Sequence, residues 1–199
     1  MIVSLFPDAM YISDDKYVLT KKQFDTIMTL DMKQNISNKV SKETYLLNKP
    51  VFRKLKAWLE KETNKYAKDV LKWNSLDFYI TQSWVNVATK GESHHPHRHP
   101  NSMLSGVYYI SPEECHIRLM RDTKMWGNFV YDHDPEQENE FNTLSSKVPI
   151  EQNKVVIFLS EQVHSVDPIE DDSIRISLAF NCFAKGNLGG RGHSSELIL

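Results

Sequence analysis

Apolar and polar positions along the chain follow a helical period up to about residue 72 and a period of two after it. After Pro50, which suits the first turn of a helix, apolar side chains recur at three- and four-residue intervals to about Lys72. Lys and Glu lie mostly on the other face, as in a helix laid over a sheet. A shorter helix is expected from Thr20 to about Met32, and the polar stretch 34–49 is expected to be a connection.

Beyond residue 77 the pattern is that of β-strands, in which alternate side chains point to opposite faces. In the last strand Ile176 and Leu178 alternate with Arg175 and Ser177. The expected strands are 78–88, 105–110, 115–120, 143–150, 154–159 and 173–183, with a short edge strand at 9–12. Two helices followed by such strands predict a mainly β fold with flanking helices, a sandwich or barrel that carries its N-terminal helices on one sheet.

We expect one domain, because 199 residues are enough to build a single core. It would consist of a helical N-terminal support (1–76), a strand core (77–184) and a Gly-rich C-terminal tail (185–199), in which residues 196–199 pair at an edge. A long segment, 121–141, contains Trp126, Tyr131 and an acidic run over 132–140. Segments of this length are often lids or binding loops, and an acidic rim would favour a basic or neutral substrate.

The composition, with 40% hydrophobic and 25% charged residues, is ordinary for a globular protein. A net charge of −2 gives no reason to expect nucleic acid as a partner. No apolar run is long enough to cross a bilayer, and the first residues lack the pattern of a signal peptide. We therefore expect a cytoplasmic protein without a membrane partner, with a homodimer left open as its assembly. Cys115 and Cys182 are expected to be reduced and buried, because two thiols make no disulfide framework.

Four of the eight histidines lie in one short stretch, His94-His95-Pro96-His97-Arg98-His99-Pro100-Asn101. Neutral imidazole binds transition metals, so a cluster of this kind suggests a metal site, although a His-rich surface loop is the simpler interpretation. In extended backbone His95, His97, His99 and Asn101 would share one face. A third ligand would have to come from another part of the chain.

Two further features fit such a site. His164 follows the buried strand that ends at Leu159, and Arg175 and Ser177 share one face of the last strand. An arginine on the interior face of a sheet is costly unless it meets an anion. A guanidinium beside a hydroxyl suits a carboxylate, which the guanidinium can hold through charge-assisted hydrogen bonds.

Four runs carry a family resemblance: His97-x-His99-Pro100-Asn101-Ser102, Ser105-Gly106-Val107-Tyr108-Tyr109, Val163-His164-Ser165-Val166, and Arg175-Ile176-Ser177-Leu178-Ala179-Phe180-Asn181. In this order they resemble the Fe(II)/2-oxoglutarate-dependent oxygenase superfamily, and more closely its small members of unassigned substrate. The resemblance implies a double-stranded β-helix (jelly roll) and a dioxygenase, commonly a hydroxylase. Such enzymes couple decarboxylation of 2-oxoglutarate to succinate with oxidation of a second substrate. The implied cofactors are Fe(II), 2-oxoglutarate and O2.

The resemblance also implies roles for individual residues. His97 matches the first histidine of the superfamily's His-x-Asp/Glu pair, His164 its distal histidine, and Arg175 and Ser177 its Arg-x-Ser pair for the far carboxylate of 2-oxoglutarate. The carboxylate position of the usual triad falls on His99. The site could therefore use three histidines, two histidines and water, or a ligand displaced to Asn101. We favour His99.

Supporting roles are less specific. Asn86 and Trp84 share the polar face of the strand before the histidines and are candidates to hydrogen-bond the 2-oxo acid, and Tyr109, which shares a face with Ser105, is a candidate to contact the cosubstrate. Asn86 and Trp84 are equally well explained as an internal pair with satisfied polar atoms, and for Tyr109 a place in the core is the simpler interpretation. The isolated histidines, at 116, 133 and 193, are not expected to bind metal.

Three other functions remain open at this point. A cupin-type three-histidine dioxygenase would not use 2-oxoglutarate, and the Arg175 and Ser177 pair argues against it. A zinc hydrolase is weaker, because no aspartate follows the histidines. A non-catalytic jelly-roll binding module could keep the pattern without turnover.

Overall fold

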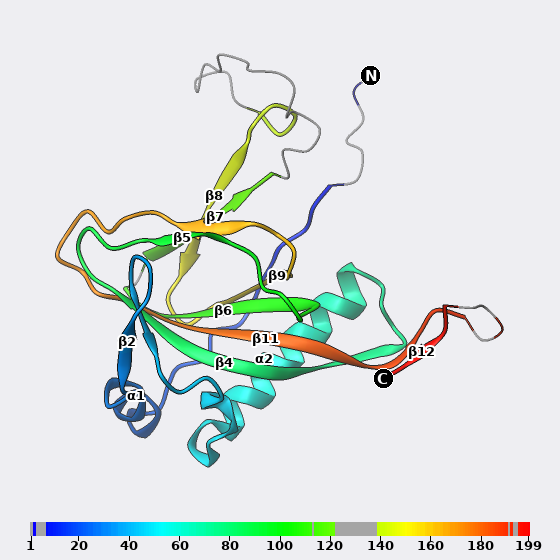
Figure 1. Ribbon diagram of the computed structural model, residues 1–199, viewed down its shortest axis with the longest axis horizontal. Helices are drawn as coiled ribbons and strands as arrows, with labels where there is room; N and C mark the ends of the chain where they lie inside the picture. Colours follow the sequence, from blue (N-terminus) through cyan, green and yellow to red (C-terminus); the bar gives the residue numbers. More distant parts are fainter. Residues whose placement is uncertain (1, 3–6, 113, 122–138, 191, 193–194) are drawn as a thin grey trace.

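The structure is a computed structural model that describes residues 2, 7–112, 114–121, 139–190, 192 and 195–199. Most of its regular elements are β-strands, and the helices come early in the chain (Figure 1). In chain order the elements are β1 (Tyr11–Ile12), α1 (Lys21–Met28), β2 (Met32–Gln34), β3 (Lys39–Ser41), η1 (Leu46–Asn48), η2 (Pro50–Phe52), α2 (Arg53–Lys65), η3 (Tyr66–Val70), β4 (Leu76–Ala88), β5 (His94–His97), β6 (Leu104–Ser111), β7 (Glu114–Met120), β8 (Ser145–Glu151), β9 (Val155–Leu159), β10 (His164–Val166), β11 (Arg175–Leu188) and β12 (Leu197–Ile198).

The strands form two antiparallel sheets that face each other (Figure 1). The larger sheet has the order β1-β9-β6-β11-β4-β3-β2, with β12 paired to β11, and the smaller has the order β5-β10-β7-β8. Helix α2 packs on the larger sheet, on the side away from the smaller one. The expectation of a mainly β fold with helices on one sheet is confirmed.

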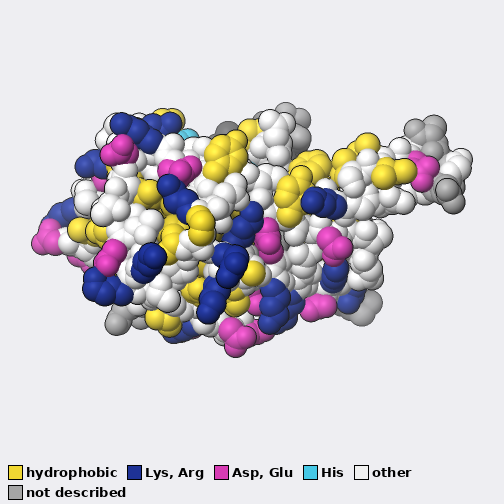
Figure 2. Space-filling model, turned by 90° about the horizontal axis from the view of Figure 1, so that it is seen from below, with side chains coloured by type: hydrophobic (Ala, Val, Ile, Leu, Met, Phe, Trp, Pro, Cys, Tyr) yellow, Lys and Arg dark blue, Asp and Glu magenta, His cyan; other side chains and the backbone are white. Residues whose placement is uncertain are grey.

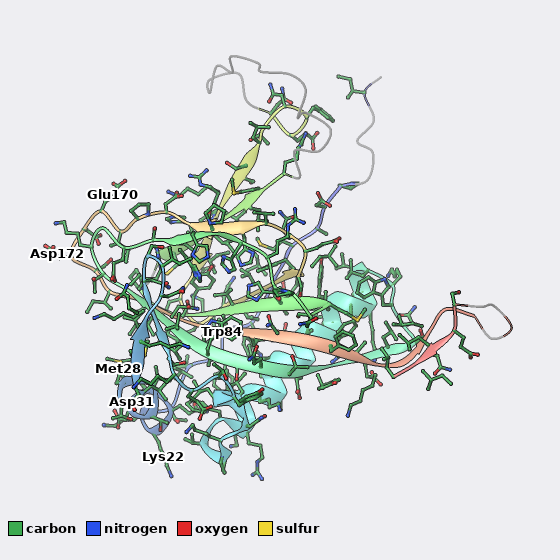
Figure 3. All side chains as sticks on the ribbon, in the orientation of Figure 1. Lys22, Met28, Asp31, Trp84, Glu170 and Asp172 are labelled. Atoms are coloured by element: carbon green, nitrogen blue, oxygen red, sulfur yellow. The ribbon has the colours of Figure 1, made fainter. Side chains whose placement is uncertain are left out.

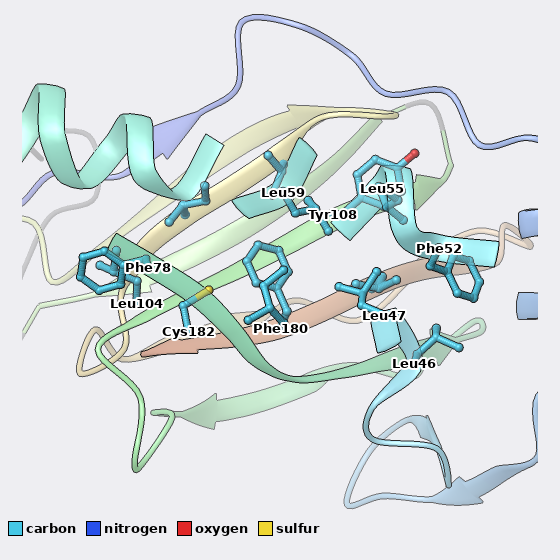
Figure 4. Packing of buried hydrophobic residues seen from close by; sticks show 14 of the residues in the cluster. Leu46, Leu47, Phe52, Leu55, Leu59, Phe78, Leu104, Tyr108, Phe180 and Cys182 are labelled. Atoms are coloured by element: carbon cyan, nitrogen blue, oxygen red, sulfur yellow. The ribbon is translucent and has the colours of Figure 1, made fainter. Parts of the chain in front are cut away.

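Strand β11 separates the apolar core from the polar interior through its period of two. Leu178 and Phe180 are fully buried against the helices, in a core that includes Leu55 and Leu59 of α2 (Figure 4). The alternate residues, 175, 177, 179 and 181, face the smaller sheet, because neighbouring side chains on a strand point to opposite faces. One face of the larger sheet therefore packs into the apolar core with the helices, and the other face presents polar side chains toward the smaller sheet.

Gly106 lets two central strands pack closely. It lies opposite Phe180 across the β6–β11 pair, and a Cβ at this position would collide with the Phe180 ring. A larger residue at 106 would therefore force the Phe180 ring to move within the core.

Elements near the N-terminus differ from the expected ones. The helix expected over 20–32 begins after Thr20, whose hydroxyl accepts a hydrogen bond from Gln23 N–H in a capping box, but it ends at Met28. The segment expected to be a connection contains β3, which pairs with β2 and with β4. Strand β3 pairs with the backbone hydrogen-bonding groups at the edge of β4, and β2 pairs in turn with β3. The local sequence of residues 32–41 does not indicate this pairing.

At the other end, β11 runs to Leu188, past the expected end at 183, and residues 187–188 pair with β12. The pairing expected for residues 196–199 is therefore confirmed. Within the segment 121–141, for which a lid or a binding loop was considered, residues 122–138 lie outside the described residues, and they include Trp126, Tyr131 and the acidic positions up to 138.

The surface seen from below in Figure 2 carries Lys and Arg interspersed with Asp and Glu, and histidine is visible only at its margin.

Both cysteines are buried and unpaired with each other, as expected. Burial raises the pKa of the Cys115 thiol to about 11, which keeps it protonated at neutral pH. Among the described residues, no helix has both the length and the apolar character needed to cross a membrane.

Candidate active site

Three histidines from two distant parts of the chain meet between the sheets. His97 is the last residue of β5, His99 follows it, and His164 begins β10 directly opposite His97 in the β5–β10 pair. One ring nitrogen from each lies within 4.8 Å of the others, and the Nε2 atoms of His99 and His164 are 3.2 Å apart. We call these residues the three-histidine cluster. Their spacing allows all three to contact one metal ion.

The hydrogen bonds of the cluster direct its free nitrogens inward. His97 Nδ1 lies 2.8 Å from the His95 carbonyl oxygen, and His164 Nδ1 lies 2.9 Å from that of Gln162. A carbonyl oxygen can only accept, so each Nδ1 carries the ring proton and each Nε2 keeps its lone pair. Histidine ligands of metals usually donate their second N–H in this way, which fixes the ring and its tautomer.

Burial keeps the cluster neutral. It lowers the pKa of His164 to about 3 and of His99 to about 4, and it also lowers that of His97. Neighbouring imidazoles add to the effect for His164 and His99, since a second positive charge would be repelled. The lone pairs are therefore available for a metal ion at neutral pH without prior loss of a proton.

A fourth histidine lies where the simple strand pattern did not place it. His94, not His95, lines the cavity beside His97, and their ring centroids are 4.3 Å apart. The cause is a bulge, because β5 takes three steps from His94 to His97 while β10 takes two from Val166 to His164. The expected common face of residues 95, 97, 99 and 101 is therefore wrong for His95 and for Asn101. Asn101 is exposed at positive φ, beyond the end of the strand.

A row of polar side chains crosses the inner face of the larger sheet next to the cluster. Ser177 of β11 pairs with Asn86 of β4 on one side and with Tyr109 of β6 on the other. Residues directly opposite each other in antiparallel strands point to the same face. All three line one cavity together with Arg175 and the cluster.

Two polar atoms of this row have no hydrogen-bonding partner among the described residues, and Arg175 beside them is weakly paired. Arg175 is only 9% exposed, and the one hydrogen bond shown for its guanidinium goes from Nη1 to the Asp167 carbonyl oxygen, at 3.1 Å. Among the described residues, nothing accepts from or donates to the hydroxyl of Tyr109 or the side-chain oxygen of Asn86. Burial lowers the pKa of Arg175 and raises that of Tyr109. Orphaned buried groups of this kind are expensive, and an anionic ligand in the cavity would satisfy them.

The cavity opens to solvent through a groove between β2, β3, β4 and the end of β5, with an atom-free volume of about 1310 Å³. Trp84, labelled in Figure 3, lies at the junction of cavity and groove, and its ring stacks on His99 with centroids 5.6 Å apart. The groove is lined by amides, hydroxyls and the basic residues Lys33 and Arg98. No described lining residue is acidic.

The isolated histidines do not join the cluster within the described chain. His116 Nε2 lies 3.3 Å from an Asp167 oxygen, in a network where Arg118 holds the same carboxylate at 2.8 Å and 2.9 Å. These contacts hold the pKa of Asp167 near 2. His133 and His193 lie outside the described residues.

One residue of the site was not assigned a role from the sequence. The side chain of Asn181, on the same face of β11 as Arg175 and Ser177, lies with its Oδ1 2.7 Å from His99 Nδ1. Its position in the strand alternation could have indicated that it faces the interior. The contact with His99 could not be inferred, because the turn after β5 sets the place of that ring.

Solved structures with the same fold are numerous, and their sequences are distant from this one. HygX from Streptomyces hygroscopicus, solved with nickel and 2-oxoglutarate bound, has 13% identity and a TM-score of 0.59, over 88% of this chain and 82% of that one. A prolyl-4-hydroxylase from Pseudomonas putida has 13% identity and a TM-score of 0.55, over 87% of this chain and 92% of that one. These likenesses confirm the jelly-roll fold. No curated protein matches the sequence.

A family model described as "Putative 2OG-Fe(II) oxygenase" matches residues 82–181. That range contains all four motif runs and covers half of the chain, from the middle of β4 to the middle of β11. The chain therefore belongs to the 2OG-Fe(II) oxygenase family, the oxidoreductases that use iron, O2 and 2-oxoglutarate.

Proposed function

We propose that the three-histidine cluster holds Fe(II) and that Arg175 and Ser177 bind the far carboxylate of 2-oxoglutarate. The observation that carries this proposal is the convergence of three neutral imidazoles next to a buried guanidinium in one cavity. Asn86 and Tyr109 would complete the cosubstrate site with their free polar atoms. The donor set fits a ferrous ion, for which imidazole is a suitable ligand, and the guanidinium fits a carboxylate.

Bound in this cluster, iron would supply the chemistry of the family: reduction of O2, coupled to decarboxylation of 2-oxoglutarate to succinate and CO2 and to oxidation of a second substrate. The protein's own contribution is positional. Arg175 and Ser177 would fix one end of the cosubstrate, so that its 2-oxo acid end points toward the cluster. The walls of the cavity, including Val107 and Ile117, would keep bulk water from the reacting groups.

His99 occupies the position where the family pattern has a carboxylate. Of the three options for this position, a histidine ligand has the best support. His99 is buried with its Nε2 beside that of His164, whereas Asn101 is exposed in the groove. With three neutral ligands, the protein would supply no negative charge to Fe(II), and the carboxylate at the 2-oxo acid end of the cosubstrate would offset one of its two positive charges.

Two other functions are less consistent with the cavity. A three-histidine dioxygenase that does not use 2-oxoglutarate would leave Arg175 buried without a carboxylate partner, at a cost in stability. A non-catalytic binding module would not need three histidines with inward lone pairs. Neither has an observation in its favour that the 2-oxoglutarate-dependent oxygenase lacks.

We also propose that the prime substrate enters through the groove that opens at Trp84. The part of its lining that the structure describes includes Lys33 and no carboxylate, which favours neutral or anionic groups at this mouth. The acidic run that suggested a basic substrate lies largely outside the described residues. A single domain divided at residues 76 and 184, a cytoplasmic location and a homodimer remain further predictions.

An anaerobic titration tests the central proposal. Protein loaded with Fe(II) should develop a weak visible charge-transfer band when 2-oxoglutarate is added, and aerobic samples should form succinate. A protein that binds Fe(II) but gives neither band nor succinate would support a different oxygenase. Absence of any tight Fe(II) binding would contradict the metal site itself.

A further inference from the structure

Asn181 differs from the other hydrogen-bonding partners of the three-histidine cluster. His97 and His164 donate to main-chain carbonyl oxygens, whose position is fixed by the fold. His99 Nδ1 instead meets a side-chain amide, with Asn181 Oδ1 at 2.7 Å. Asn181 is 8% exposed and has no part in the proposed function so far.

The proton on His99 decides whether the cluster is open to a metal. The Nε2 atoms of His99 and His164 are 3.2 Å apart, which is hydrogen-bonding distance. His164 keeps its proton on Nδ1 for Gln162, so its Nε2 can only accept. If the His99 proton were on Nε2, it would bond His164 and occupy both lone pairs. If it is on Nδ1, both lone pairs point into the cluster.

An oxygen acceptor at Nδ1 selects the open form. With its Oδ1 facing His99, Asn181 can only accept there, so the ring proton is held on Nδ1. The competing tautomer would lose this bond, and it would place two acceptors 2.7 Å apart. The acceptor therefore works against the internal His99–His164 bond.

The Asn181 amide is itself held in place. Ser105 Oγ donates to Asn181 Oδ1 at 3.1 Å and is 2.8 Å from Ser160 Oγ, which bonds Ser102 Oγ, also at 2.8 Å. On the other side of the site, Trp84 stacks on the His99 imidazole at an interplanar angle of 24°. The His99 ring is thus held on its face by Trp84 and at its Nδ1 edge by Asn181.

We propose that Asn181 is a positioning residue that holds His99 in the tautomer open to metal. The inference rests on the proposed function, because it takes His99 as a metal ligand. Histidine ligands with such partners typically lose about 10- to 100-fold in metal affinity when the partner is removed. Asn181 would thereby orient the His99 ring, which stands at the position where the superfamily's usual triad has a carboxylate.

The test compares Asn181→Leu, which has similar size and no acceptor, with Asn181→Asp, which can only accept. Affinity for Co(II) is measured by calorimetry. The His99 tautomer in the metal-free protein is measured from its ¹⁵N chemical shifts. We expect Asn181→Leu to weaken Co(II) binding by about 10- to 100-fold and to move the His99 proton to Nε2. Asn181→Asp should keep the Nδ1 proton and the affinity of the parent.

Asn64→Leu is the matched control. Asn64 is also a partly buried asparagine whose side chain bridges two elements, since it donates to and accepts from the backbone of Phe78 at 2.8 Å. It lies on the helix side of the larger sheet, away from the cavity. This variant should lose stability while Co(II) affinity and the His99 tautomer stay unchanged.

Two results would overturn the inference. One is a folded Asn181→Leu protein with the parent's Co(II) affinity. The other is an Asn181→Leu protein that keeps the His99 proton on Nδ1. A His99→Ala variant separates this failure from that of the proposed function. If His99→Ala binds Co(II) as tightly as the parent, His99 is not a ligand and the metal-site proposal fails as well.

Discussion

Replacement of Arg175 by methionine should move stability and cosubstrate binding in opposite directions. Arg175 is 9% exposed, and its guanidinium donates a hydrogen bond to a neutral carbonyl group, that of Asp167. The nearby Asp167 carboxylate is already held by Arg118 at two nitrogens. In the ligand-free protein Arg175 is therefore a buried charge whose desolvation is poorly compensated, as its lowered pKa indicates.

The expected magnitudes follow from this environment. Exchange of a poorly paired buried charge for an apolar side chain of similar volume is often neutral or stabilising by about 1–4 kcal/mol. Loss of the partner of a buried, hydrogen-bonded carboxylate costs about 2–5 kcal/mol of binding free energy. The second figure corresponds to a rise in the Kd for 2-oxoglutarate of roughly 30-fold to several thousand-fold.

Two measurements test this prediction. The Kd comes from an anaerobic titration of the Fe(II)-loaded protein with 2-oxoglutarate, followed by the visible charge-transfer band. Stability comes from urea unfolding of the ligand-free protein. Arg118→Met is the control, because Arg118 holds Asp167 and does not line the cavity. This control should lose stability and keep the parent's Kd.

The reasoning fails if Arg175→Met binds 2-oxoglutarate as tightly as the parent. It also fails if the ligand-free variant is destabilised by more than about 3 kcal/mol, since the guanidinium would then be a structural group whose removal leaves partners unpaired.

The remaining predictions concern the metal, the pH dependence and the core. Replacement of any one member of the three-histidine cluster by alanine should weaken Co(II) binding by roughly 100-fold or more, while His116→Ala, outside the cluster, should leave calorimetric titrations unchanged. Burial lowers the pKa of His164 to about 3 in the folded metal-free protein, whereas in the unfolded chain this histidine has the ordinary pKa of about 6.5. Below pH 6.5 the unfolded chain therefore binds more protons than the folded protein. The free energy of unfolding should therefore fall as the pH drops from 6.5 toward 4, and His164→Ala should show a shallower fall. Gly106→Ala, which pushes against Phe180, should cost about 1–3 kcal/mol in urea unfolding; an unchanged midpoint would contradict the close approach.

The sequence by itself determined the class of fold and the strand face on which Arg175 and Ser177 lie. The period of two in 173–183 already separated Leu178 and Phe180 from Arg175 and Ser177, and the structure places these two sets on opposite faces of β11. This is possible because strand alternation is a local property that any sheet must respect. The central strands were predictable for the same reason, and the helical segment after Pro50 was predictable from its own period of three to four residues, although α2 ends at Lys65 and η3 continues to Val70.

Only the tertiary structure decided which side chains meet. The register His164 opposite His97 depends on pairing between β5 and β10, which are far apart in the sequence. The bulge in that pair turned His94, not His95, toward the cavity. The contact of Asn181 with His99 also crosses from β11 to the turn after β5. Periodicity reports which face of a strand a residue occupies, whereas contacts between strands depend on register and bulges, and these follow from how the whole chain packs.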